Sequence, residues 1–246
     1  MGVSSMSDTG KRIMIIAVPA LIMASAGSLW AASAAGEMRK GLEEMEEGRH
    51  LAASTNFLAA AELAAGQERE PALAFFNAGN ALYRAGELER AEESYQRALD
   101  SDDLELQSRV FYNLGNILLK RSGAALKENE AKLALNLYER ARAEYEKAIV
   151  LDPEYIDPKY NYELAGQRKY DLLSQVDQLR ADMEKARRQA RAAEYSAAFQ
   201  LLQEKTPKHQ LAFQLEPGLK KKYEELMKKI GDIAQIITQT GGGEDA

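Results

Sequence analysis

The chain has 246 residues and no cysteine, so it can form no disulfide, zinc–thiolate site or catalytic thiol. Hydrophobic residues make up 46% of the sequence, which is enough for a core, but aromatic residues make up only 7%. With so few aromatics and so many alanines, close-packed helices are favoured over a sheet sandwich. The formal net charge of -6 argues against general nucleic-acid binding, because neutralising phosphates requires clustered Lys and Arg.

Residues 1–35 have the features of an export signal. The basic pair Lys11-Arg12 precedes an uncharged run at 13–35, and the small residues at 32–34 fit a cleavage site. An uncleaved anchor is the alternative, because about 20 apolar residues can span a bilayer. In either case we expect the rest of the chain to be exported, to the periplasm or the periplasmic face of the inner membrane of a bacterial envelope.

Almost all of the chain after this signal is expected to be helical. No stretch alternates apolar and polar residues as a strand does, and Gly or Pro interrupts the sequence at short intervals, as turns between short helices require. The hexapeptide FFNAGN at residues 75–80 recurs as FYNLGN at residues 111–116, 36 positions later (111 minus 75). Recurrence at a period of about 20–50 residues is typical of proteins built from stacked repeats.

Residues 72–105 show what one repeat contains. Gly79 lies midway along the first expected helix, Gly86 ends that helix, and the second helix carries a stripe of three residues: Ala91, Tyr95 and Ala98. This arrangement resembles the tetratricopeptide repeat, a helical hairpin of about 34 residues with the pattern W-x2-L-G-x2-Y, then A-x3-F, then P. The pattern positions of the first helix hold Phe75, Ala78, Gly79 and Leu82, and Asp103 stands where Pro is usual.

The resemblance implies a solenoid over residues 36–155, in which small residues mark the close crossing of two helices and neighbouring hairpins bury each other's apolar faces. Residues 36–69 form an atypical first repeat, as suits an end repeat, and residues 108–155 form a third. The glycine-to-alanine spacing is 19 residues in the second repeat but 33 in the third, which indicates a 14-residue insertion (Gly79 to Ala98, and Gly115 to Ala148). We place the insertion at residues 121–134, between the two helices, and expect it to lengthen the second helix by one or two turns and to leave a protruding loop.

Residues 156–240 are expected to form a C-terminal helical extension. Glu163 occupies the place of the close-packing glycine, so the helix that begins near Pro158 should stack on the third repeat as a long capping helix without a tight partner. Five apolar residues farther along recur at four and three positions and form a coiled-coil-like seam: Leu172, Val176, Leu179, Met183 and Ala186. A last helix follows at about 219–237, and residues 241–246 are expected to be disordered. The expected fold class is all-α: about three hairpin repeats, a capping helix and C-terminal helices.

The recurring asparagines are the candidate site. The resemblance places Asn77, Asn113 and Asn161 at one helix position on the concave face of the solenoid, with Asn80 and Asn116 one turn farther on. Because a carboxamide both donates and accepts hydrogen bonds, such a row can bind the backbone of an extended peptide whatever its side chains. Aromatic and basic residues complete the predicted peptide-binding set: Phe76, Tyr83, Arg84, Tyr112, Lys120 and Tyr160. The alternative is that the asparagines bond only the neighbouring helices of the repeats.

The sequence contains no pattern typical of catalysis or metal binding. His50 and His209 have no second histidine or carboxylate cluster at ligand spacing, and no nucleophile elbow or phosphate loop occurs. We place His209 in a proline-flanked loop, and we interpret the basic stretch KARRQAR at residues 185–191 as a solvated helix face. We therefore expect neither enzymatic activity nor a cofactor or metal.

These features predict a non-enzymatic adaptor or scaffold in the cell envelope that binds a segment of a protein partner in the concave groove. The alternative is a structural homo-oligomer whose chains pair through the seam or the last helix. No nucleic acid is expected as a partner, and contact with the membrane is expected only through the N-terminal segment, if that segment is not cleaved. A narrower resemblance covers about residues 72–180. This region resembles exported tetratricopeptide proteins that are encoded beside MoxR-type ATPases and von Willebrand A-domain proteins, the aerotolerance group. The shared features are two well-matched repeats, then Asp-Pro, then KYNYEL at the start of a long helix.

Overall fold

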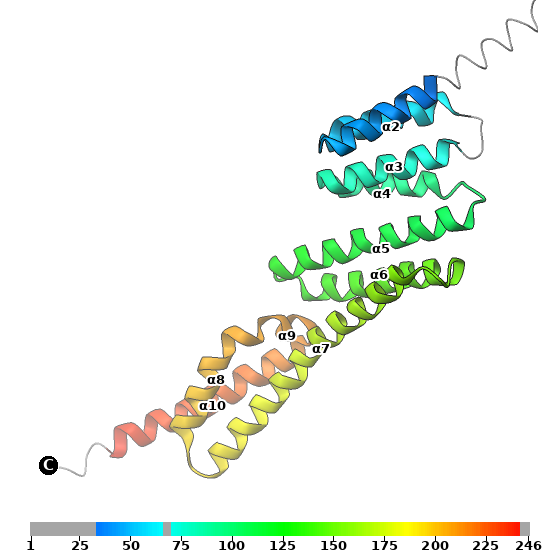
Figure 1. The fold of residues 1–246 in the computed structure, drawn as a ribbon. Coiled ribbons are helices and arrows are strands. Elements are labelled where there is room, and N and C mark those ends of the chain that lie inside the picture. The colour runs from blue at the N-terminus through cyan, green and yellow to red at the C-terminus, as the bar shows by residue number, and fades with distance from the viewer. Residues whose placement is uncertain (1–32, 66–69, 242–246) are drawn as a thin grey trace, which may run out of the picture. The chain divides into compact units, whose positions relative to one another are not determined.

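The computed structural model describes residues 33–65 and 70–241, and this part of the chain consists of helices and the turns between them, without a strand (Figure 1). The predicted all-α fold is confirmed. The chain divides into two compact units, residues 1–113 and 114–246, and the division falls within helix α5 (Leu104–Lys127). Apart from its last three residues, the predicted signal segment lies outside the described residues, as does the predicted tail beyond residue 241. No helix in the described part combines the length and the hydrophobicity that crossing a bilayer requires.

The N-terminal unit, residues 1–113, contains stacked helical hairpins. The helical residues 33–46 pair with α2 (His50–Leu63), and α3 (Glu70–Ala85) pairs with α4 (Leu88–Ala98). Gly48 and Gly86 close the two turns with φ angles of 76° and 87°, a conformation that glycine adopts without strain. Helix α2 also packs on α3, so one hairpin rests on the next, as the repeat pattern predicts.

Glycines mark the points where the two helices of a hairpin cross. A Cβ atom built on each of three glycines would lie 2.5–2.6 Å from a ring of the second helix: Gly41 from Phe57, Gly79 from Tyr95, and Gly115 from Tyr145. Carbon atoms in contact normally stay about 3.5–4.0 Å apart, so only glycine fits these positions. The rings themselves are buried. The predicted close crossings are thus confirmed in all three repeats.

The same substitution at two glycines of α5 should have opposite effects. At Gly115 a methyl group overlaps the buried Tyr145 ring, so Gly115→Ala is expected to lower the free energy of unfolding by about 1–3 kcal/mol. At Gly123 a Cβ meets nothing within 4 Å, so Gly123→Ala should raise it by about 0.5–1 kcal/mol through helix propensity. Urea denaturation measures both changes. An equal loss in the two variants would contradict the packing described here.

The C-terminal unit, residues 114–246, contains the remainder of α5 and six further elements: α6 (Ala131–Leu151), α7 (Ile156–Arg191), α8 (Tyr195–Lys205), the short 3-10 helix η1 (Thr206–His209), α9 (Gln210–Leu215) and α10 (Pro217–Gly241). Helix α7 has 36 residues and packs along α6, which confirms the predicted long capping helix. Its later part is covered by α8 and α9 instead of a tight second repeat helix. The predicted boundary between solenoid and extension at residue 155 stays a prediction.

The expectation of a protruding loop in the third repeat is wrong. Helices α5 and α6 have 24 and 21 residues, against 16 and 11 in α3 and α4, and only residues 128–130 separate them. The insertion therefore lengthens both helices, not the second alone. Its sequence explains why: three alanines of the lengthened helices, on either side of the turn, are buried, namely Ala125, Ala131 and Ala134. Asn129, with a φ of 60°, makes the tight turn.

Four of the five seam residues of α7 pack against other helices of the same chain. Val176, Leu179, Met183 and Ala186 are buried in one cluster with apolar side chains of α8, α9 and α10. Ile230 of the last helix lies in the same cluster. The period of the seam thus indicates packing within the chain. Ile233 of the last helix is 39% exposed, so the homo-oligomer alternative keeps only the last helix as a surface and stays a prediction.

Candidate functional site

Two hydrogen-bond networks of the same composition, here called the Asn–Tyr–Asn networks, occur once in each unit. In the N-terminal unit, Asn80 Oδ1 accepts from the Tyr95 hydroxyl at 2.8 Å and from Asn113 Nδ2 at 2.9 Å. In the C-terminal unit, Asn116 Oδ1 accepts from the Tyr145 hydroxyl at 2.9 Å and from Asn161 Nδ2 at 2.8 Å. Each network joins both helices of one repeat to the first helix of the next element.

The networks explain why the hexapeptide recurs. Its glycine makes room for the tyrosine ring, its second asparagine accepts the tyrosine hydroxyl, and its first asparagine donates to the preceding repeat. The tyrosines are buried, and burial, more than the neighbouring Tyr83 hydroxyl, raises the pKa of Tyr95, so this phenol stays protonated as a donor. Four of the five predicted asparagines therefore bond neighbouring helices, as the alternative interpretation proposed. A second role in ligand binding stays a prediction.

Asn77 is the exception, because it begins the series. The residue one position after the crossing glycine is Asn80 in the second repeat but Leu42 in the first. An aliphatic side chain cannot accept a hydrogen bond, and the ring at this crossing, Phe57, has no hydroxyl. The half-buried Asn77 carboxamide forms no hydrogen bond with the described residues, so its donors and acceptor are available.

The aromatic and basic residues predicted for the N-terminal unit lie around its network. The Phe76 ring is 6.0 Å from that of Tyr95. Tyr83 is half-buried, and burial together with the nearby Tyr112 raises the pKa of Tyr83. Arg84 is exposed on the same helix and forms no ion pair with the described residues. These neighbours bring five predicted residues of α3 together with two of α5, namely Phe76, Asn77, Asn80, Tyr83, Arg84, Tyr112 and Asn113.

The predicted residues of the C-terminal unit form a smaller group. Asn116 and Asn161 bond each other, and Lys120, one turn beyond Asn116 on α5, is exposed. Tyr160 is 69% exposed even though the adjacent Asn161 faces α5. Tyr160 therefore points away from the Asn116–Asn161 pair and does not belong to that cluster.

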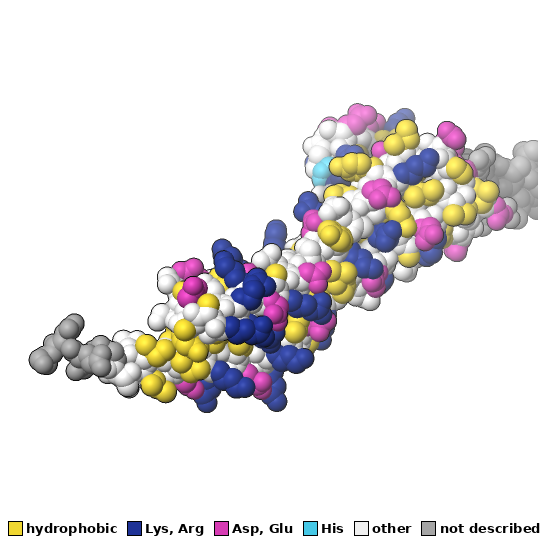
Figure 2. All heavy atoms as spheres, turned by 90° about the horizontal axis from the view of Figure 1, so that it is seen from below, with side chains coloured by type: hydrophobic (Ala, Val, Ile, Leu, Met, Phe, Trp, Pro, Cys, Tyr) yellow, Lys and Arg dark blue, Asp and Glu magenta, His cyan; other side chains and the backbone are white. Residues whose placement is uncertain are grey.

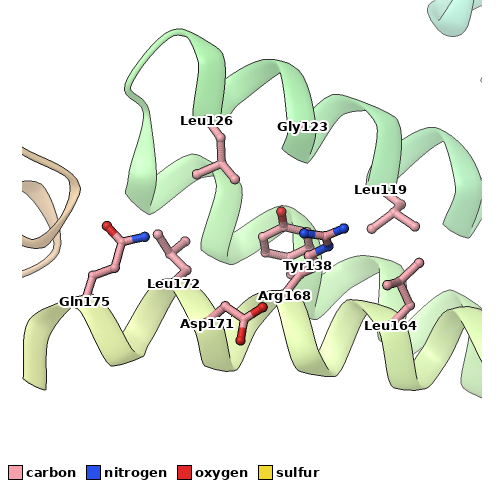
Figure 3. A pocket seen from close by; sticks show the side chains of 9 residues that line it. All are labelled: Leu119, Gly123, Leu126, Tyr138, Leu164, Arg168, Asp171, Leu172 and Gln175. Carbon is pink, nitrogen blue, oxygen red and sulfur yellow. The ribbon is translucent and has the colours of Figure 1, made fainter. Parts of the chain in front are cut away.

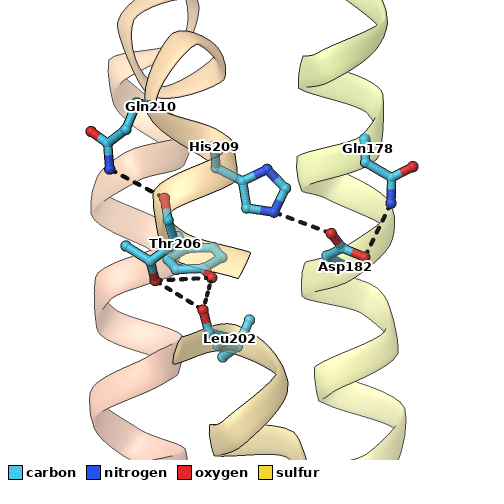
Figure 4. Close-up of polar contacts among 7 residues, drawn as sticks. Gln178, Asp182, Leu202, Thr206, His209 and Gln210 are labelled. Atoms are coloured by element: carbon cyan, nitrogen blue, oxygen red, sulfur yellow. Dashed lines mark hydrogen bonds and ion pairs between the residues drawn. The ribbon is translucent and has the colours of Figure 1, made fainter. Parts of the chain in front are cut away.

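Sequence reasoning missed a buried histidine–aspartate pair, shown in Figure 4. His209 ends η1, not a loop, and its Nε2 lies 3.1 Å from Asp182 Oδ2 of α7, with both side chains almost fully buried. Gln178 donates to the other Asp182 oxygen at 3.1 Å, and the His209 ring lies 5.8 Å from that of Tyr223. A single carboxylate thus accompanies His209, although it lies far from it in the sequence. The one signal was Asp182 itself, a charged residue directly before Met183 of the seam.

The surroundings of the pair point to a structural role. No group of three metal-ligating side chains occurs within residues 33–65 and 70–241. Burial lowers the pKa of His209, and Asp182 opposes that shift, which favours a neutral imidazole inside the bundle of α7–α10. A neutral histidine beside a carboxylate is consistent with a structural role that fixes η1 against α7.

We expect this histidine to make stability pH-dependent. Because the folded pKa of His209 lies below its ordinary value of 6.5, the unfolded chain binds more protons. The stability that the neutral His209 contributes is therefore complete above pH 6.5 and is lost as the pH falls below that value. Melting temperatures between pH 7.5 and 5.5 should fall more steeply in the unaltered protein than in His209→Gln, and parallel curves would rule out this assignment.

The basic stretch 185–191 lies at the end of α7. Lys185, Arg188 and Arg191 are exposed, as expected for a solvated face. Figure 2 shows Lys and Arg side chains gathered on the surface of the C-terminal helices. They stand among acidic neighbours, such as Glu184, which pairs with Arg187.

Comparison with known proteins agrees with the geometry of the second repeat. Residues 72–103 match the family model described as tetratricopeptide repeat. No curated protein matches the chain. The matched residues include the hairpin of α3 and α4, its crossing at Gly79 and Tyr95, and the turn glycine Gly86. Residues 72–103 are therefore a tetratricopeptide repeat, and the rest of the chain that the structure describes is helical as well.

Proposed function

We propose that the chain is a non-enzymatic adaptor that binds a segment of a protein partner on one face of α3. Tetratricopeptide repeats are interaction modules, and the observation that carries the proposal is the unused bonding capacity of this helix. Asn77 and Arg84 are seven residues apart, which places them on the same side of α3. Neither side chain forms a hydrogen bond or an ion pair with the described residues, whereas Oδ1 of the asparagine between them, Asn80, already accepts two hydrogen bonds.

The chemistry of this face favours an extended segment that contains an acidic residue. The Asn77 carboxamide can bond both the N–H and the C=O of a peptide backbone. The exposed Arg84 guanidinium can form a two-pronged bond with a carboxylate. Beside them, the half-buried rings of Phe76 and Tyr83 offer apolar surface of the kind that is enriched at interface cores.

We further infer that this adaptor acts in the cell envelope. The support is the basic pair Lys11-Arg12 and the uncharged run at 13–35, which are typical of export. The narrower resemblance to exported tetratricopeptide proteins over about residues 72–180 points the same way. The partner would then be an envelope protein.

A capture experiment tests the proposed face. The full chain and its Asn77→Ala/Arg84→Ala variant are immobilised, exposed to solubilised envelope, and the bound proteins are identified by mass spectrometry. The matched control is Arg90→Ala/Gln96→Ala, two exposed residues of α4. We expect one partner to be lost from the α3 variant alone. Identical captures from all three proteins would exclude this face. Asn113 is unsuitable as a target, because its replacement would also remove an internal bond to Asn80.

A further inference from the structure

The helices lengthened by the insertion line a hollow of about 510 Å³ together with α7. Figure 3 shows its walls, which come from α5, α6 and α7. Four leucines form the apolar part of the lining: Leu119, Leu126, Leu164 and Leu172. The volume lies within the range of about 300–1,000 Å³ that is usual for small-molecule sites. The hollow lies wholly in the C-terminal unit and shares no residue with the proposed partner face.

Gly123 is a reason to regard this hollow as a site. It stands inside α5, where glycine weakens a helix, and a Cβ there would meet nothing within 4 Å. The crossing glycines differ, because each of them accommodates an aromatic ring. Packing within the chain therefore gives no reason for glycine at position 123. Close approach of a ligand to the backbone of α5 would give one, since Gly123 is part of the lining.

Polar groups without internal partners face the same space. Tyr138 of α6 is 3% exposed, and its hydroxyl forms no hydrogen bond with the described residues. Arg168 of α7 forms no ion pair with them, unlike the neighbouring Lys169, which pairs with Glu139 at 2.9 Å. In Figure 3 the Arg168 side chain reaches from α7 toward Tyr138.

One acidic residue, Asp171, also lines the hollow, and it limits which ligands fit. Its Oδ1 accepts a hydrogen bond from Gln167 at 2.7 Å, so part of its capacity is already used on the surface of α7. In Figure 3 its carboxylate stays beside α7, whereas the guanidinium of Arg168 extends toward α6. An anionic group bonded to Arg168 and Tyr138 would thus lie on the α6 side of the hollow.

We propose that this hollow binds a small amphipathic carboxylic acid, with its aliphatic body among the four leucines and its carboxylate on Arg168 and the Tyr138 hydroxyl. A guanidinium and a phenol are both donors, so they complement a carboxylate that accepts from each. The aliphatic body would lie against the backbone at Gly123, where any side chain would obstruct it. The insertion in the third repeat then has a role, because it supplies the lengths of α5 and α6 that carry Gly123 and Leu126.

Calorimetric titration of the full chain with octanoate tests the proposal. We expect saturable binding of octanoate, about fivefold weaker binding of octan-1-ol, and the weakest binding of octylammonium, because only the carboxylate gains charge-assisted hydrogen bonds. Equal affinities for the three probes would overturn the assignment of Arg168, and an absence of octanoate binding would overturn the site.

Two variants and one control place the binding in the hollow. A Cβ at position 123 meets nothing within 4 Å and Gly123 lines the hollow, so we expect Gly123→Leu to occupy the space, abolish octanoate binding and keep the melting temperature. Arg168→Gln should weaken octanoate about fivefold and leave octan-1-ol unchanged. Lys159→Gln, an exposed residue of α7 outside the lining, should change neither. Octanoate binding that survives Gly123→Leu would disprove the location.

Discussion

Tyr145→Ala is expected to lower the free energy of unfolding by about 3–5 kcal/mol, the range for large aromatic side chains removed from a core. The Tyr145 ring is fully buried against Gly115, where no other residue approaches the bare backbone so closely. Its removal leaves a cavity at the helix crossing. It also removes one of the two donors to Asn116 Oδ1.

Tyr145→Phe separates the ring from the hydroxyl. It keeps the ring and deletes only the 2.9 Å bond to Asn116, so we expect a loss of about 1 kcal/mol. Chemical denaturation of both variants gives the two values. If the phenylalanine variant lost as much as the alanine variant, the hydrogen bond and not the packing would dominate, and the account of the crossing would be wrong.

Leu179→Ala is expected to cost about 2–5 kcal/mol of stability while leaving the oligomeric state unchanged. Leu179 is fully buried, and it packs in one cluster with residues of α8, α9 and α10, among them Leu202 and Tyr223. Truncation therefore creates a cavity inside the chain and uncovers no surface between chains. Denaturation measures the stability, and light scattering measures the molecular mass.

Leu173 provides the control on the same helix. It is 39% exposed and belongs to neither the seam nor the cluster, so Leu173→Ala should change stability by less than about 0.5 kcal/mol. A dimer in the unaltered protein that dissociates in Leu179→Ala would restore the seam as an interface between chains and contradict the intramolecular packing.

Much of the fold follows from the sequence because its strongest signals are local. Gly79 and Gly115 predict close helix crossings, because a close approach to the backbone leaves no room for a side chain. In the structure the rings of Tyr95 and Tyr145 lie against these two glycines. Gly86 predicts the end of α3, because a φ of 87° is open to glycine alone at little cost. Glu163 predicts the absence of a tight crossing on α7, because a charged side chain cannot occupy that place.

The errors concern contacts between distant segments. The insertion reads as a loop because it lies between two matched helices, yet its alanines pack well enough to continue both. The seam at 172–186 reads as a surface for another chain because its period is the same whether the partner helix belongs to that chain or to this one. The order in which α8, η1 and α9 return across α7 is not encoded in that period.

The candidate site shows the same division. The recurrence of Asn80 and Asn116 could be read from the sequence, but their hydrogen bonds could not. Oδ1 of each accepts from a tyrosine and from a second asparagine, and these donors lie 15 to 45 residues away in the sequence. His209 and Asp182 are 27 residues apart (209 minus 182), and no motif connects them. Asn77 differs from its counterparts because the first repeat has Leu42, which cannot accept a hydrogen bond, where the later repeats have an asparagine.

Photocrosslinking tests the central claim, that a protein partner binds along α3, most directly. A benzoylphenylalanine replaces Phe76, the half-buried aromatic residue beside Asn77, and in a matched sample it replaces Gln96 on the exposed side of α4. After irradiation of the cells that produce the protein, we predict a single major adduct from position 76 and none from position 96. An adduct from position 96 alone, or none from either position, would contradict the claim and remove α3 as the binding surface.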